Sequence, residues 1–171
     1  MGMTIAVTGH RPKKLWGYDM EDLRYIKLRE KLEMILIEKF KETDQITAVS
    51  GMAIGVDTLF AEACLALKRR GYNIRLIAAV PFTGQETKWP ESSQNLYHEL
   101  LAKASEIVVV SEGGYEPYKM QKRNEYMVDM SDELIAVWSG EAGGTANCIR
   151  YAQENHVPVT RIYPQNINAR C

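Results

Sequence analysis

Short apolar runs alternate with longer amphipathic stretches along the whole chain. The apolar runs predict β-strands over residues 4–8, 46–49, 74–80, 106–110, 133–138 and 157–162. Between them, apolar residues such as Leu28, Leu32 and Leu36 recur at helical spacing. This spacing predicts helices that end near residues 40, 70, 103, 130 and 155. We expect the first helix to begin after Asp19 or Asp22, and the later ones to begin near residues 57, 92, 119 and 145.

The strict alternation of strands and helices predicts an α/β fold. Several strands are unbroken apolar runs, which is typical of a parallel sheet covered by helices on both faces. We therefore expect a Rossmann-like three-layer sandwich with a mostly parallel central sheet, whose strand order the pattern leaves open. A chain of 171 residues fits a single domain, taken here as residues 1–171.

Three predicted strands run into turns that contain glycine. The first turn carries Gly9, the second runs from Ser50 through Gly51 and Gly55 to Asp57, and the third is Gly143-Gly144-Thr145. Glycine lets the backbone approach a ligand, and a helix start offers free N–H groups at the positive end of its dipole. Parallel strands place such turns on one edge of the sheet, where phosphates bind, so the sequence predicts a site for a nucleotide or a nucleotide derivative.

Each turn also has a simpler structural interpretation. Asp57 can be only the N-cap of its helix, and Thr145 can cap a plain strand-to-helix connection. The glycine spacing is not the dinucleotide fingerprint, and the Gly-Lys-Ser/Thr of a P-loop is absent. Kinase-type and ordinary dehydrogenase chemistry are therefore disfavoured.

Side chains near the turns suggest further ligand contacts. Arg11 is suited to grip a phosphate through two hydrogen bonds. His10 can donate to a phosphate or act as an acid or base, or it can simply bond to the backbone. In the loop that starts at Pro81, Trp89 can stack on a base or pack against the sheet. Cys148 is expected to be buried, with a reactive thiolate as the less favoured alternative.

Charge, hydropathy and cysteine content bear on the partners and the cellular location of the protein. The net charge is −1, so no bulk basic field recruits nucleic acid. We expect no membrane span and no signal segment. Three cysteines with no metal-ligand spacing suggest a reducing cytoplasm, no disulfide framework and no metal site.

The turns together resemble the SLOG superfamily, named for the Smf/DprA DNA-processing proteins and the LOG nucleotide hydrolases. Residues 50–58 are similar to the Ser-Gly-x-Ala-x-Gly-Ile-Asp turn of the Smf/DprA branch. Residues 8–12, the loop from Pro81 to Trp89 and the Gly143-Gly144-Thr145 turn resemble the YpsA-like branch. The resemblance covers almost the whole chain. It implies a nucleotide-derived ligand, such as NAD, ADP-ribose or a nucleoside phosphate, with no required cofactor.

A second resemblance concerns catalysis. LOG hydrolases carry a Met-x-x-Arg-Lys-x-x-Met helix, which Met120, Arg123 and Met127 match, so Arg123 matches their catalytic arginine. Cys148 stands where their catalytic glutamate would be. A carboxylate stabilises the oxocarbenium-like state of glycosidic cleavage better than a cysteine does. N-glycosidase activity then requires a substitute from Asp57, Glu62 or Glu141.

Three functions follow for comparison. The favoured one is a sensor or binding protein for a nucleotide derivative. The second is a nucleotide N-glycosidase that uses Arg123, and the third is a single-strand DNA-binding module, which the balanced charge disfavours. A homo-oligomer is expected because symmetric assembly is common for such domains.

Overall fold

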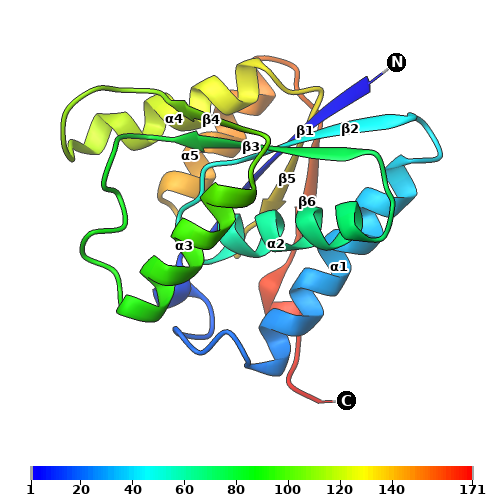
Figure 1. The fold of residues 1–171 in the computed structure, drawn as a ribbon, viewed down its shortest axis with the longest axis horizontal. Helices are drawn as coiled ribbons and strands as arrows, with labels where there is room; N and C mark the ends of the chain where they lie inside the picture. Colours follow the sequence, from blue (N-terminus) through cyan, green and yellow to red (C-terminus); the bar gives the residue numbers. More distant parts are fainter. Residues whose placement is uncertain (1, 171) are drawn as a thin grey trace.

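The computed structural model describes residues 2–170, which form one sheet between two layers of helices (Figure 1). The strands are β1 (Gly2–Gly9), β2 (Gln45–Ser50), β3 (Ile74–Val80), β4 (Glu106–Val109), β5 (Glu133–Val137) and β6 (Val159–Ile162). The helices are α1 (Leu23–Lys39), α2 (Val56–Arg69), α3 (Glu91–Lys103), α4 (Pro117–Asp129) and α5 (Gly144–Glu154). Two short 3₁₀ helices, η1 (Pro12–Lys14) and η2 (Pro164–Asn166), complete the elements. The predicted α/β sandwich is confirmed.

All the strand pairs are parallel, in the order β4-β3-β2-β1-β5-β6. The chain moves outward from β1 to β4 and then returns to the other side of β1 with β5. This reversal makes a topological switch point between β1 and β5, where ligands of open α/β sheets bind beyond the carboxyl ends of the strands.

Alternating side chains of the sheet fill two cores. In β1, Ile5 and Val7 face the core beneath α1, α2 and α3, whereas Ala6 faces the core beneath α4 and α5. The α1 side chains Leu28 and Leu32 are fully buried in the first core. Figure 1 shows the same division, with α4 and α5 together on one side of the sheet. Because both faces are covered, the strands read as continuous apolar runs.

Two helix starts differ from the sequence prediction. The N-cap of α2 is Gly55 instead of Asp57 or Thr58, and the N-cap of α5 is Gly143 instead of Thr145. Both glycines have positive φ, 109° and 142°, a region that side-chain-bearing residues rarely adopt. By contrast, Asp22 caps α1 as one of the two predicted choices and accepts the Arg24 N–H.

Smaller differences lie at other element ends. Helix α4 begins at Pro117, two residues before its predicted start, because proline is favoured in the first turn of a helix. Strand β6 begins at Val159, because His156 has a left-handed φ of 59° and the preceding backbone turns there.

Candidate functional site

The loops after β1 and β5 and the first turn of α2 meet at the switch point around one cavity. Its volume is about 350 Å³. It is lined by Thr8, Gly9, His10, Arg11, Lys13, Lys14, Ala53, Asp57, Met120, Arg123, Asn124, Gly144 and Thr145. Residues from three glycine turns are therefore brought together, as expected for turns on one edge of a parallel sheet.

The cavity is strongly cationic although the whole chain is not. Arg11, Lys13, Lys14 and Arg123 line it, and Asp57 is the only carboxylate that does. The first three come from one short segment, because Arg11 is the N-cap of η1 and Lys13 and Lys14 lie within it. Arg11, Lys13 and Lys14 are exposed, whereas Arg123 and Asp57 are buried. The arrangement suits an anion that reaches in from solvent.

Two helix N-termini add to this field. Gly144 and Thr145 begin α5, and Asp57 lies in the first turn of α2, so both helix starts border the cavity. Neither helix has a side-chain cap on its first turn. Unpaired N–H groups and the positive end of the dipole at such starts favour phosphate or carboxylate groups.

Arg123 is held in place by backbone carbonyls. Its Nη1 donates to the carbonyl oxygens of Gly51 and Ala79, and its Nε donates to Asn124 Oδ1 at 3.0 Å. Burial lowers the pKa of the guanidinium, and the nearby Asp57 carboxylate partly opposes that shift. Arg123 thus ties α4 to the ends of β2 and β3 while one side of it borders the cavity.

Asp57 has a structural partner of its own. Its Oδ2 accepts the Ala53 N–H at 3.2 Å, which closes the turn before α2. Burial raises the pKa of the carboxyl group, and the positive charges of Arg123 and Arg11 together with the Ala53 hydrogen bond act against that rise.

His10 is fixed in one tautomer. Its Nε2 accepts the backbone N–H of Ser139 at 3.1 Å and lies 2.9 Å from the Ser139 hydroxyl. An Nε2 that accepts a backbone N–H carries no proton, so the proton of the neutral ring is on Nδ1. Burial, followed by the charge of Lys14, lowers the pKa of His10. A neutral His10 can therefore offer one N–H donor and is not poised as a cationic acid.

Hydrogen bonds between its own residues stabilise the turn after β2. The Ser50 hydroxyl donates to the Asp57 carbonyl at 2.7 Å and accepts the Met52 N–H at 3.1 Å. Met52 has a left-handed φ of 61°, which is uncommon for a residue with a side chain. A Cβ on Gly55 would lie 2.7 Å from the His10 carbonyl oxygen. Ser50, Gly51 and Gly55 thus hold the shape of the turn but do not line the cavity.

The side chain of Lys14 contacts the turn after β5. The Lys14 Nζ donates to the Ala142 carbonyl at 3.3 Å and lies 3.8 Å from Glu141 Oε2. A Cβ added at Gly143 would lie 3.1 Å from the same Nζ. Gly143 therefore lets Lys14 reach across the cavity mouth, although Gly143 itself does not line the cavity.

Pro81 and Trp89 lie apart from this cavity. Pro81 directly follows β3 and is buried, and its carbonyl accepts the Ser111 N–H at 3.1 Å. The Trp89 ring packs edge-on against Tyr97, with ring centroids 5.3 Å apart, and contacts the core. In this structure Trp89 therefore has the packing role that was one of its two sequence interpretations.

Family comparison agrees with this architecture. A family model described as the YspA SLOG family matches residues 5–167. The chain belongs to the YspA SLOG family. It is 32% identical over 158 residues to the SPbeta prophage-derived protein YoqJ of Bacillus subtilis, a match that covers 85% of this chain and 92% of that protein. It is also 26% identical over 142 residues to the UPF0398 protein YpsA of B. subtilis, covering 82% and 78% of the two chains.

Solved structures share the fold. DNA processing protein A from Helicobacter pylori, described by its single-stranded DNA binding mode, superposes with a TM-score of 0.62 at 18% identity. The match covers 96% of this chain and 70% of that one. DNA processing protein A from Streptococcus pneumoniae gives a TM-score of 0.59 at 20% identity, covering 93% and 50%. At these identities the likeness concerns the fold alone.

The three carboxylates that could replace the glutamate of the LOG resemblance lie at different distances from the cavity, and Cys148 itself offers no carboxylate. Cys148 is fully buried, and burial raises the pKa of its thiol to about 11. Glu62 lines a separate depression together with Arg29, and Glu141, whose Oε2 lies 3.8 Å from Lys14 Nζ, does not line the cavity. Asp57 is the only one of the three that borders the cavity.

Several lining residues were not predicted. Lys13 and Lys14 follow Arg11-Pro12 directly, and this run of cations after the first strand was a signal that the sequence analysis left unused. Thr8 is the penultimate residue of β1, and Ala53 lies in the turn between Ser50 and Asp57. Asn124 and Met120 flank Arg123 on α4, and their place in the cavity depends on the packing of that helix. Residues 2–170 contain no group of three or more metal-ligating side chains, and no helix among them is long and apolar enough to cross a membrane.

Proposed function

We propose that this protein binds a nucleotide-derived anion at the switch-point cavity and acts as a sensor or regulatory binding protein. The observation that carries this proposal is the charge of the lining, in which four cationic side chains face a single buried carboxylate. Phosphate groups would lie among Arg11, Lys13 and Lys14, close to the starts of α2 and α5. NAD, ADP-ribose and nucleoside phosphates are the candidate ligands.

Binding without catalysis is favoured by what the buried groups already do. Arg123 already donates hydrogen bonds to the carbonyls of Gly51 and Ala79 and to the side chain of Asn124. Asp57 closes its own turn, and burial raises its pKa. An N-glycosidase needs a carboxylate that faces the sugar and an activated water. In the described chain, Asp57 is the only carboxylate at the cavity to serve that purpose.

A single-strand DNA role is a second candidate because the exposed cations Arg11, Lys13 and Lys14 stand at the cavity mouth. The fold neighbour from H. pylori is described as binding single-stranded DNA. Phosphates of a strand would use the same side chains as a free nucleotide. A competition between an oligonucleotide and ADP-ribose separates a shared site from independent binding.

The test of the proposal is a ligand panel followed by chemical recovery of each hit. Purified protein is screened by thermal shift against NAD, ADP-ribose, nucleoside mono-, di- and triphosphates and cyclic nucleotides. Each stabilising ligand is then incubated and analysed by chromatography. A rise in melting temperature with the ligand recovered intact supports the binding protein. Release of free base or nicotinamide would replace the proposal with an enzyme, and no shift with any member would refute nucleotide binding.

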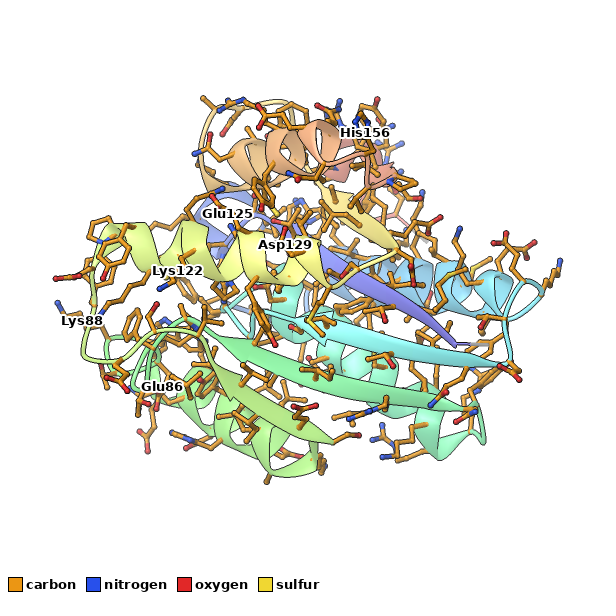
Figure 2. All side chains as sticks on the ribbon, turned by 90° about the horizontal axis from the view of Figure 1, so that it is seen from above. Glu86, Lys88, Lys122, Glu125, Asp129 and His156 are labelled. Carbon is orange, nitrogen blue, oxygen red and sulfur yellow. The ribbon has the colours of Figure 1, made fainter. Side chains whose placement is uncertain are left out.

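A matched pair of lysine variants makes the screen specific to the cavity. Lys14→Ala removes a lining cation, and Lys88→Ala removes an exposed lysine from the loop between β3 and α3 (Figure 2). We expect the ligand-induced shift to fall in Lys14→Ala and to persist in Lys88→Ala. Equal shifts in the two variants would place the ligand elsewhere.

A further inference from the structure

A second cavity of about 420 Å³ lies beside the first, on the other side of the turn between β2 and α2. It is lined by Tyr18, Asp19, Met20, Ile54, Thr58, Ser92, Ser93 and Leu96. Its size falls within the range of about 300–1,000 Å³ that is usual for small-molecule sites. The two cavities have no lining residue in common.

The turn at the start of α2 separates the cavities residue by residue. Ala53 and Asp57 face the cationic cavity, whereas their neighbours Ile54 and Thr58 face the second one. The first loop packs directly onto this turn, since a Cβ on Gly55 would lie 2.7 Å from the His10 carbonyl and 3.3 Å from Pro12 Cδ. The second cavity is therefore separate from the first.

The chemistry of the second cavity is opposite to that of the first. No lysine or arginine lines it, and its only charged side chain is Asp19. Met20, Ile54 and Leu96 supply apolar walls, and Tyr18 supplies an aromatic ring. A phosphate would gain no cationic partner here and would be repelled by the carboxylate. A flat, uncharged ring suits these walls instead.

Every polar side chain of this cavity can accept a hydrogen bond, and the hydroxyls of Tyr18, Ser92 and Ser93 can also donate one. Asp19 Oδ1 accepts the Glu21 N–H at 3.0 Å, and its Oδ2 accepts no hydrogen bond from residues 2–170. Thr58 already donates its hydroxyl proton to the Gly55 carbonyl at 3.0 Å, so its oxygen is left to accept. The hydroxyls of Ser92 and Ser93 make no side-chain hydrogen bond within the described chain. Such a set matches a ring that carries both N–H donors and acceptor atoms, with an N–H group donating to Asp19.

From these observations we propose that the second cavity binds an uncharged nucleobase-type heterocycle, presented as a nucleoside without phosphate. Its ring lies against Ile54, Leu96 and Tyr18, and its N–H groups donate to Asp19 and the serine hydroxyls. This inference goes beyond the nucleotide-anion function and does not depend on it. A protein with both sites can carry an anionic ligand and a neutral one on either side of the same turn.

Calorimetric titration with adenosine, guanosine, cytidine and thymidine tests this site. We expect one of these nucleosides to bind the wild-type protein at millimolar concentration or better. Saturating inorganic pyrophosphate should leave that affinity unchanged within about twofold, because the cationic cavity is separate. Absence of binding by all four up to about 10 mM would overturn the proposal. Competition by pyrophosphate would do the same, since it would place the nucleoside in the cationic cavity.

Two variants of different kinds locate the nucleoside. Leu96 is half-buried on α3, so Leu96→Trp places a larger ring in the cavity. Asp19→Asn removes the charge but keeps an Oδ1 that can accept the Glu21 N–H. We expect each to weaken nucleoside binding by about tenfold or more, as loss of an apolar wall or of a charge-assisted hydrogen bond does. Lys14→Ala, in the other cavity, is the matched control and should change it by less than about twofold. Unchanged nucleoside binding in Asp19→Asn, or weakening only in Lys14→Ala, would refute the assignment even if Leu96→Trp folds poorly.

Discussion

Replacing Arg123 by methionine tests whether this residue is mainly part of the framework. Methionine keeps a long unbranched side chain but cannot donate to the carbonyls of Gly51 and Ala79. Hydrogen bonds from a charged donor are worth about 1.5–3 kcal/mol each, so the two bonds together contribute about 3–6 kcal/mol. Removing a buried guanidinium also relieves its desolvation, which is the main cause of its lowered pKa.

The net effect of Arg123→Met is therefore smaller than the gross value. We expect the free energy of unfolding to fall by about 2–4 kcal/mol, since the carbonyl of Gly51 keeps its hydrogen bond from Gln85 Nε2 at 3.2 Å. At this chain length, each kcal/mol lowers the melting temperature by about 2–4 °C. The variant should then melt roughly 4–16 °C below the wild type.

Differential scanning calorimetry without ligand measures this difference. Lys122→Met is the matched control, because Lys122 precedes Arg123 on α4 and is exposed (Figure 2). We expect the control to melt within about 1 °C of the wild type, as surface substitutions usually do. If Arg123→Met melts at the same temperature as Lys122→Met, Arg123 does not hold the ends of β2 and β3 together. The framework role would then be wrong, and a purely functional role would take its place.

Three further predictions concern residues that line the switch-point cavity or support its walls. Gly51→Ala should lower the melting temperature, because the added Cβ would overlap the Arg123 guanidinium, whereas Gly114→Ala, with no atom within 4 Å of the added Cβ, should not; equal melting would contradict this. An NMR pH titration should find the pKa of His10 below its ordinary value of 6.5, because burial disfavours the charged ring. The stability that neutral His10 contributes is then full above pH 6.5 and declines as the pH falls through the lower folded pKa. A pKa above 6.5 would refute the claim that burial keeps His10 neutral. Asp57→Asn should strengthen binding of an anion at pH 7, because it removes the only carboxylate of the lining. Burial raises the pKa of Asp57, so the ionised carboxylate lowers the stability of the wild-type protein as the pH rises. The thermal stability gained by Asp57→Asn should therefore be larger at pH 8 than at pH 5. Weaker binding by Asp57→Asn would indicate that the carboxylate itself contacts the ligand, as in an enzyme.

Much of the fold follows from the apolar pattern of the sequence. The predicted strand at residues 74–80 has the same bounds as β3, because its apolar run ends sharply at Pro81. The caps of α2 and α5 were not predictable in the same way. Their N-cap residues are Gly55 and Gly143, whose positive φ depends on the packing of the surrounding loops. Side-chain preferences for capping pointed to Asp57 and Thr145 instead.

The site was predictable where it is built from backbone turns and less so where it depends on packing. Gly9, Arg11 and Gly144 line the cavity because they follow strands that end on one edge of the sheet. Ser50 is turned inward by its bonds to Asp57 and Met52, which no local pattern reveals. Trp89 is drawn to Tyr97 by the course of a long loop, and long-range contacts of this kind are not encoded by spacing.

The most direct test of the central claim is a calorimetric titration with inorganic pyrophosphate, which probes the cationic cavity without any choice of base. We predict binding that weakens as salt is raised, is lost by about tenfold or more in Lys14→Ala, and is unchanged in Lys88→Ala. Absence of binding by the wild-type protein, or equal affinities in the two lysine variants, would contradict the claim that this cavity is an anion site.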